Sequence, residues 1–181
     1  LKLNTWLYVD NKGQLPYLTN EEIKHHSDGL ICLTGGAEGP IGQLICTSQT
    51  TAGKSLLMTY AEVFKNRLYV EVQRHPTDDS LPEAERISEP VFIDFAYELA
   101  LPLVATNNVF FKNPDMYEAH DALLCIAEGA YVDQQEPRRR LTPQHYFKSA
   151  SEMITLFADL PEAIENTVEI AQRCAFKAPL R

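Results

Sequence analysis

The chain has 181 residues, 45% of them hydrophobic and 23% charged, and its formal net charge is −9. This composition is ordinary for a globular protein with one sizeable core. The acidic balance argues against a principal nucleic-acid-binding face, which is usually basic, and the apolar runs are too short to span a membrane. The cysteines (Cys32, Cys46, Cys125 and Cys174) form no C-x-x-C pair. We therefore expect reduced, buried thiols in a cytoplasmic protein, and neither a zinc site nor a disulfide framework.

The first residues, LKLNTWLYVD, have neither the basic start nor the apolar centre of a signal peptide. They also lack an initiator Met, which predicts that the chain is a fragment of a longer protein. Residues 1–18 are predicted to be irregular, with Trp6 and Tyr8 packed. Thr19 and Glu22 then form a capping box, which predicts a short helix to about residue 27.

The following residues alternate between strand and helix patterns. The predicted elements are a buried strand at 30–33, a glycine-rich loop at 34–40, a helical turn at 41–45, a helix at 52–65, an alternating strand at 68–73, an exposed acidic loop at 74–90, a helix at 91–99, a buried strand at 101–105, and a helix from Asp115 to about 127 that Gly129 ends. Such alternation predicts an α/β fold with a mostly parallel sheet or barrel.

The pattern changes near residue 133, which predicts two regions. Residues 1–132 form the α/β part, and residues 133–181 form a polar linker and a helical segment. Thr142 and Pro143 have the order of a helix start. A stripe of apolar residues predicts a final helix that ends near Cys174.

Two glycine motifs invite a phosphate-binding interpretation. Gly53-Lys54-Ser55 lacks the first glycine of a phosphate loop, because Ser48 stands there. We therefore interpret Lys54 as a surface lysine at a helix start. The glycines between residues 35 and 42 do not have G-x-G-x-x-G spacing, so a tight turn is the better interpretation, with anion binding a weaker one.

The strand at 68–73 offers candidate metal ligands. Glu71 and Gln73 share one face, and His75 continues it. A carboxylate and an imidazole in this order could bind Zn²⁺ or Mn²⁺. The alternative is a polar strand end at a barrel mouth, which the absence of a second nearby histidine favours. The other histidines (His25, His26, His120 and His145) have no partner at ligand spacing, and no nucleophile motif is present.

Residues 101–111, LPLVATNNVFF, pose the main question of the sequence. A buried strand leads into Thr106-Asn107-Asn108, a polar exit at the end of the strand where α/β folds place their chemistry. The chain then becomes apolar at residues 109–111. The strand end has the shape of a site but no titratable side chain.

Five sequence blocks carry a resemblance to a known family. In order they are DGLICLTGGAEGPIG, RLYVEVQRH, LPLVATNNVFF, EAHDALLCIAEG and LFADLPEAIENTVEIAQRC. This series resembles the alpha subunits of bacterial DNA polymerase III over residues 1–174. It is similar to the second half of their N-terminal polymerase and histidinol phosphatase (PHP) domain and the start of the next segment.

The resemblance implies a fold and a parent activity. It implies part of a distorted (β/α)₇ barrel followed by a short all-helical segment. The parent would be a replicative polymerase that extends DNA primers from deoxynucleotides, with Mg²⁺ held by a palm domain outside this sequence. Implied partners are DNA and the other polymerase III subunits, including the proofreading exonuclease. Metal-bearing PHP relatives hold Zn²⁺ or Mn²⁺ at the strand ends and hydrolyse phosphoesters.

Residue by residue, the resemblance implies a decayed site. The metal-competent form has T-N-D-x-H, so Asn108 replaces an Asp ligand and Phe110 replaces a His ligand. His75 matches a further ligand position. We expect a structural and docking region with no catalytic residue of its own. The alternative is a metal-dependent 3′–5′ nuclease half-domain that uses His75, Glu71 and upstream ligands. Exposed barrel edges would also favour a dimer.

Overall fold

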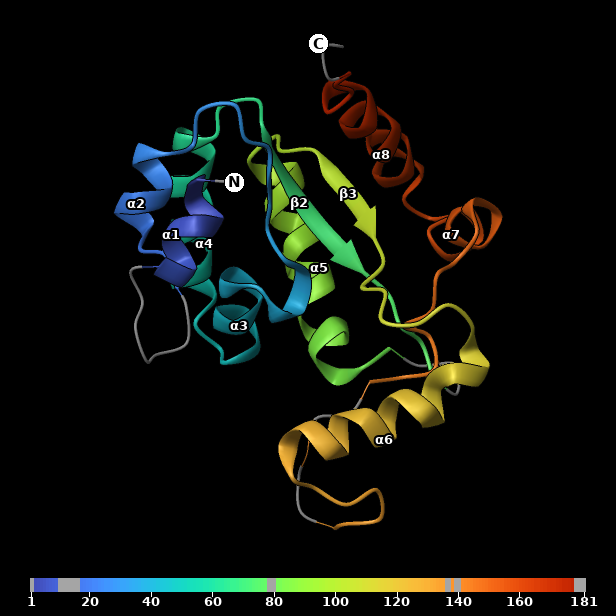
Figure 1. Ribbon diagram of the computed structural model, residues 1–181. Coiled ribbons are helices and arrows are strands. Elements are labelled where there is room, and N and C mark those ends of the chain that lie inside the picture. The colour runs from blue at the N-terminus through green and yellow to red at the C-terminus, as the bar shows by residue number, and fades with distance from the viewer. Residues whose placement is uncertain (1, 10–16, 78–80, 136–137, 139–140, 178–181) are drawn as a thin grey trace.

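A three-stranded parallel sheet forms the centre of the chain (Figure 1). The computed structural model describes residues 2–9, 17–77, 81–135, 138 and 141–177. The strands lie in the order β1 (Cys32–Leu33), β2 (Leu68–Gln73) and β3 (Leu103–Thr106). The parallel sheet confirms the predicted α/β class. Because all three strands run the same way, their carboxyl ends meet at one edge, where the candidate site lies.

Helices surround this sheet. They are α1 (Lys2–Val9), α2 (Asn20–His25), α3 (Pro40–Cys46), α4 (Thr50–Val63), α5 (Glu83–Glu98), α6 (Tyr117–Glu128), α7 (Ala150–Leu156) and α8 (Pro161–Arg173), with short 3₁₀ turns η1 (Gly36–Glu38) and η2 (Pro114–Met116). In Figure 1, α5 packs behind β2, whereas α6 extends away from the sheet. None of the described helices is long and apolar enough to cross a membrane.

The strand β2 is buried on both of its faces. Val70 and Val72 lie in the main apolar core together with Phe92 and Phe95 of α5. Glu71, which alternates with them, is also buried. The strand therefore carries a polar side chain into the interior, and that side chain requires hydrogen-bond partners there.

Helix α8 covers the outer edge of β3. The Asn166 Nδ2 atom donates to the Leu103 carbonyl oxygen at 2.7 Å. The Tyr69 hydroxyl donates to Glu169 at 2.8 Å. The Arg173 guanidinium donates to the Tyr69 hydroxyl at 2.7 Å. A helix of the same chain thus satisfies a carbonyl that an open sheet edge would leave for another strand.

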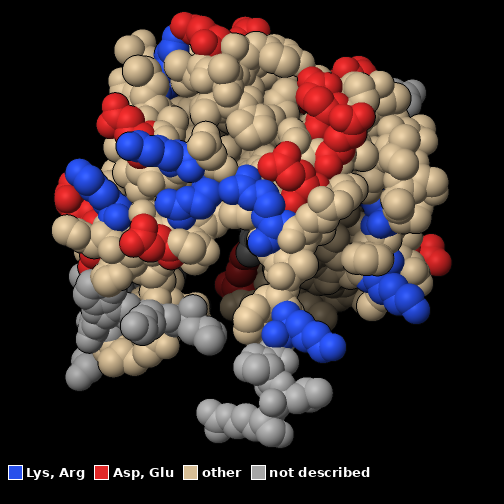
Figure 2. All heavy atoms as spheres, turned by 90° about the horizontal axis from the view of Figure 1, so that it is seen from above, with Lys and Arg blue, Asp and Glu red and all other residues tan. Residues whose placement is uncertain are grey.

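Both signs of charge lie on the face at the amino ends of the strands. Figure 2 shows Lys and Arg side chains in a band across this face, with Asp and Glu on either side. Arg67 on this side of the sheet donates to the carbonyl oxygens of Ser27 at 2.5 Å and Leu30 at 2.7 Å. At least this arginine serves the fold by satisfying loop carbonyls.

The structure corrects the predicted exposed loop at 74–90. Helix α5 begins at Glu83 and continues through Pro90. Glu85 is 8% exposed and Ser88 is 2% exposed. Pro90 removes one helical hydrogen bond and disfavours a helix at this position. Burial of the apolar face of α5 stabilises the helix by more than this cost.

Several predicted element bounds were also wrong. Strand β1 has only two residues, and Leu33 is 38% exposed where a buried strand was expected. Residues 2–9 form a helix, and Tyr8 is exposed. The side chain of Trp6 lies outside the described residues. Short apolar runs do not distinguish a buried strand from a loop that crosses a sheet edge.

The predicted helix starts had mixed outcomes. Thr19 forms the expected capping box with Glu22, and Gly129 ends α6 in the left-handed conformation. Asp115 lies in η2 and does not cap α6 through its side chain. Thr142 begins no helix, since α7 starts after a capping box formed by Ser149 and Glu152. The division at residue 133 stays a prediction.

The predictions for the four cysteines and for Lys54 can be compared with the structure. All four cysteines are free thiols, but of the four only Cys125 is buried as expected, because Cys32 and Cys46 are half-buried and Cys174 is exposed. Lys54 lies within α4 and forms an ion pair with Glu98 at 2.5 Å. Residues 50–53 before it are also helical, so no glycine-rich loop precedes Lys54.

Candidate functional site

Glu71 joins the carboxyl ends of all three strands. Its carboxylate accepts hydrogen bonds from the Gly35 amide at 2.8 Å and from Gln73 Nε2 at 3.1 Å. The Thr106 hydroxyl at the end of β3 also donates to it. Its own backbone amide donates to the Thr34 hydroxyl at 2.9 Å. Both carboxylate oxygens are therefore engaged within the protein.

The glycine-rich turn after β1 is shaped by close backbone packing. Gly35 has a φ of +84° and places its amide toward Glu71. A Cβ at Gly39 would lie 2.2 Å from the Thr34 carbonyl oxygen, and one at Gly42 would lie 2.3 Å from the Gly36 carbonyl oxygen. These contacts account for Gly39 and Gly42 without a bound phosphate, which supports the tight-turn interpretation.

His75 is held by a carboxylate from the first turn of α5. It is 1% exposed, its backbone amide donates to Glu85 Oε2 at 2.8 Å, and its Nδ1 lies 2.6 Å from Glu85 Oε1. Its Nε2 is buried and has no hydrogen-bond partner among the described residues. With the Nδ1 proton on the side of Glu85, the lone pair of the neutral ring lies on the buried Nε2 atom. Histidines that bind metals are often oriented this way.

His145 stacks on His75 from a loop distant in sequence. The two ring centroids are 3.8 Å apart, and the planes are inclined by only 7°. The Thr142 amide lies 3.1 Å from His145 Nδ1 and donates to it. The same Nδ1 atom lies 3.1 Å from the Thr142 hydroxyl and 3.2 Å from the Thr142 carbonyl oxygen, so it can act as an acceptor or as a donor. Burial, together with the nearby His75, lowers the pKa of His145 to about 4.

The lowered pKa of His145 predicts a pH dependence of stability. Between pH 6.5 and about pH 4 the unfolded chain binds more protons at this residue than the folded chain. The free energy of unfolding should therefore fall as the pH falls through this range, by up to about 1.4 kcal/mol per pH unit. Urea unfolding of wild type and His145→Asn, whose side-chain oxygen can replace Nδ1 as acceptor, should show a smaller slope in the variant. Equal slopes of the free energy of unfolding against pH in the two proteins would contradict the lowered pKa of His145.

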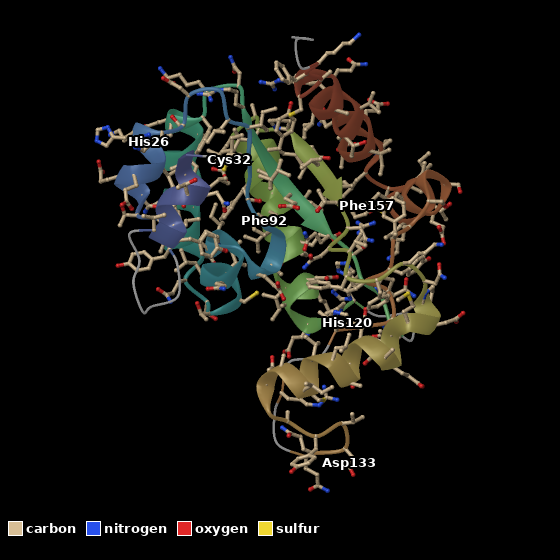
Figure 3. The ribbon with its side chains drawn as sticks, viewed as in Figure 1. His26, Cys32, Phe92, His120, Asp133 and Phe157 are labelled. Carbon is tan, nitrogen blue, oxygen red and sulfur yellow. The ribbon has the colours of Figure 1, made fainter. Side chains whose placement is uncertain are left out.

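Asn108 lies in the wall of a small cavity at the strand ends. The cavity has a volume of about 130 Å³, and Gln73, His75 and His145 also line it. Glu71 is not among its lining residues. Phe110 packs nearby, with its ring centroid 5.6 Å from that of His120 and 6.0 Å from that of His145. Figure 3 labels His120 between α6 and the strand ends. The structure thus places His75 and Asn108 at the same cavity. Glu71 forms hydrogen bonds between the strand ends and does not line this cavity.

The residues at this cavity do not fit a multinuclear metal site. Both oxygens of Glu71 already accept hydrogen bonds, and Phe110 has no donor atom. Thr142 contacts His145 Nδ1 through its amide, hydroxyl and carbonyl groups, whereas His75 Nε2 is buried and has no hydrogen-bond partner among the described residues. In the described part of the chain, no three His, Cys, Asp or Glu side chains are grouped as a metal ion requires. A multinuclear site needs several anionic or imidazole ligands around each ion.

Arg74 is a cation with a largely buried side chain that the sequence analysis missed. Its five N–H groups reach two carboxylates and one carbonyl. The Nε and Nη2 atoms donate to Glu89 at 2.6–3.1 Å. The Nη1 and Nη2 atoms donate to Asp159 at 2.6 and 2.8 Å, and Nη1 also donates to the Leu156 carbonyl oxygen at 2.8 Å. The guanidinium lies 4.7 Å from the centroid of the Phe157 ring. Arg74 therefore ties β2 to α5 and to the α7–α8 connection.

Glu85, His145 and Lys148 were also missed. The Lys148 ammonium donates to Asn107 Oδ1 at 3.3 Å and to the Gln144 carbonyl oxygen. Burial lowers its pKa. Glu85 lies ten positions after His75, in a stretch whose acidity and prolines suggested a loop. A glutamate in the first turn of a helix is one signal that could have identified it.

Comparisons with known proteins identify relatives of this chain. Residues 2–75 match the family model described as the PHP domain. The chain is 49% identical over 177 residues to the DNA polymerase III subunit alpha of Caulobacter vibrioides, which covers 97% of this chain. The chain is homologous to a segment of the DNA polymerase III alpha subunit.

Other alpha subunits give the same result. The identity is 42% to the subunit of Rickettsia bellii and 37% to that of Pseudomonas aeruginosa, over 98% and 97% of this chain. The chain spans about 15% of the length of these DNA polymerase III alpha subunits. The resemblance inferred from the five sequence blocks is confirmed.

Proposed function

We propose that the chain is a structural and docking part of the PHP region in a DNA polymerase III alpha subunit, without hydrolytic activity of its own. The observation that carries this proposal is the engagement of Glu71, whose two oxygens bind groups from the ends of β1, β2 and β3. A carboxylate used in this way stabilises the sheet and is not open to a metal ion. Asn108 and Phe110 support the same conclusion, because neither supplies an anionic or imidazole ligand.

The parent subunit would extend DNA primers, using Mg²⁺ in a domain outside this chain. In the whole subunit, upstream strands would complete a distorted barrel next to β1. The acidic composition of this chain favours protein partners over DNA at this region. Other polymerase subunits, including a proofreading exonuclease, are the partners that we propose, in the cytoplasm. We also propose that the isolated chain dimerises through the β1 edge of the sheet.

A second candidate function is a metal-dependent 3′–5′ nuclease. The specific observation that favours it is His75, because Glu85 holds its Nδ1 and its Nε2 has no partner in the described residues. Upstream histidines of a full subunit could then join His75 around Zn²⁺ or Mn²⁺. This candidate requires Glu71 to exchange its present hydrogen bonds for a metal.

A hydrolysis assay on the full-length subunit separates the two candidates. The subunit should be purified without the exonuclease subunit and incubated with 3′-labelled DNA and Zn²⁺ or Mn²⁺. We expect no metal-dependent 3′–5′ hydrolysis, and His75→Ala should not change the background rate. His26→Ala, at an exposed helix end, is the matched control. Hydrolysis that is lost in His75→Ala but kept in His26→Ala would overturn the proposal in favour of the nuclease.

A further inference from the structure

The segment of residues 141–148 runs beside the exit of β3 and forms part of the wall of the small cavity there. Leu141, Thr142 and His145 of this segment line the cavity together with Gln73 and Asn108 of the strand exits. We propose that this segment is a strap that controls access to His75, with the His145 ring as its contact on the histidine. The inference concerns access alone and holds whether or not the site is catalytic.

Four hydrogen bonds attach the strap to the exit of β3. The Phe110 amide donates to the His145 carbonyl oxygen at 2.9 Å, and the Phe147 amide donates to the Phe111 carbonyl oxygen at 3.0 Å. The Asn107 side-chain amide donates to the Tyr146 carbonyl oxygen at 2.6 Å. The fourth bond joins Lys148 to Asn107. Phe111 and Tyr146 also form a parallel bridge, so the strap pairs with the chain after β3 much as a short extra strand would.

The strap covers one face of the His75 ring. This ring is 1% exposed, and the His145 ring covers one face of it at a centroid distance of 3.8 Å. Glu85 occupies Nδ1, so Nε2 is the atom that the cavity would offer to a reagent. Lifting the strap removes the stacked ring and opens the cavity wall at the same time.

Opening of the strap also breaks the hydrogen bond from the Tyr146 hydroxyl to Glu152 in the first turn of α7, at 2.5 Å. The strap leads into α7, whose carboxyl end is fixed by the bonds from Arg74 to Leu156 and Asp159. On the other side, the His75–Glu85 contact lies entirely between β2 and α5. Local opening of residues 141–148 therefore breaks the four attachments, the bond to α7 and the ring stack but leaves the main core packed. Such openings of weakly attached segments are common in folded proteins.

Chemical modification of histidines tests this proposal in the full-length subunit. Diethyl pyrocarbonate should modify His75 slowly, and peptide mass spectrometry can compare its rate with those of the exposed His25 and His26 in the same sample. His145→Ala should raise the rate at His75 by about tenfold or more, equivalent to about 1.4 kcal/mol in the opening equilibrium. Phe147→Ala is the matched control, because this side chain belongs to the same segment but is 70% exposed. It should leave the rate at His75 unchanged.

A second variant keeps the test decisive if His145→Ala does not fold. Asn107→Ala removes the side-chain bonds to Tyr146 and Lys148 without changing a residue of the cavity wall, and it should raise the rate at His75 by at least about threefold. The proposal is overturned if wild-type His75 reacts as fast as His26. It is also overturned if the folded variants of His145 and Asn107 protect His75 as well as the wild type does.

Discussion

Replacing Arg74 by methionine is expected to lower the free energy of unfolding by about 3–5 kcal/mol, the usual cost of removing one partner from a buried ion pair. The side chains of Arg74 and Glu89 are only 12% and 11% exposed. Without the guanidinium, the largely buried Glu89 carboxylate loses its cation, and the Leu156 carbonyl loses its donor. Urea unfolding followed by circular dichroism would measure the change.

A surface ion pair of the same chain provides the control. Lys54→Met removes the partner of Glu98, but these side chains are 31% and 59% exposed. We expect a loss of less than about 1 kcal/mol from this substitution. Arg74→Lys should recover only part of the loss, because an ammonium has three donors and cannot reach two carboxylates and a carbonyl as the planar guanidinium does. If Arg74→Met cost no more than Lys54→Met, the buried network would not stabilise the fold as described.

Replacing Glu71 by glutamine is expected to lower the free energy of unfolding by about 2–3 kcal/mol, because buried donors would lose their acceptor. Gly35, Gln73 and Thr106 all donate to the carboxylate. An amide keeps only one acceptor oxygen and presents its own N–H groups to the other donors. Thermal or urea unfolding of the purified chain would measure the effect.

The sign of this effect distinguishes a structural from a metal-binding Glu71. A carboxylate kept for metal binding is usually a cost to the metal-free fold, so its replacement by an amide would leave stability unchanged or raise it. A structural carboxylate gives a loss. Glu62→Gln, at an exposed position of α4, should change the free energy of unfolding by less than about 0.5 kcal/mol. Equal effects at Glu71 and Glu62 would contradict the structural role.

Local sequence signals predicted the parts of the fold that depend on neighbouring residues. The alternation of residues 68–73 identified β2, and the capping box at Thr19 identified the start of α2. The same alternation placed Glu71 and Gln73 on one face, where they form a hydrogen bond. These features follow from periodicity and capping, which operate over a few residues.

Contacts between distant residues could not be read from such patterns. Arg74 and Asp159 are 85 positions apart, and the stack of His75 on His145 joins segments separated by α5, β3 and α6. Glu85 and Glu89 suggested a solvated loop because their buried partners, His75 and Arg74, were not recognised. Charged residues are usually exposed unless they are paired, and local sequence does not show the pairing.

The metal content of the full-length subunit tests the central claim most directly. The protein should be purified from cells supplied with Zn²⁺ and Mn²⁺, dialysed without a chelator, and analysed by plasma mass spectrometry alongside His75→Ala. If the strand end has only a structural role, we expect well below one Zn²⁺ or Mn²⁺ per chain, with no difference between the two proteins. One or more equivalents in the wild type that are lost in His75→Ala would show that the strand end is a working metal site and would contradict the claim.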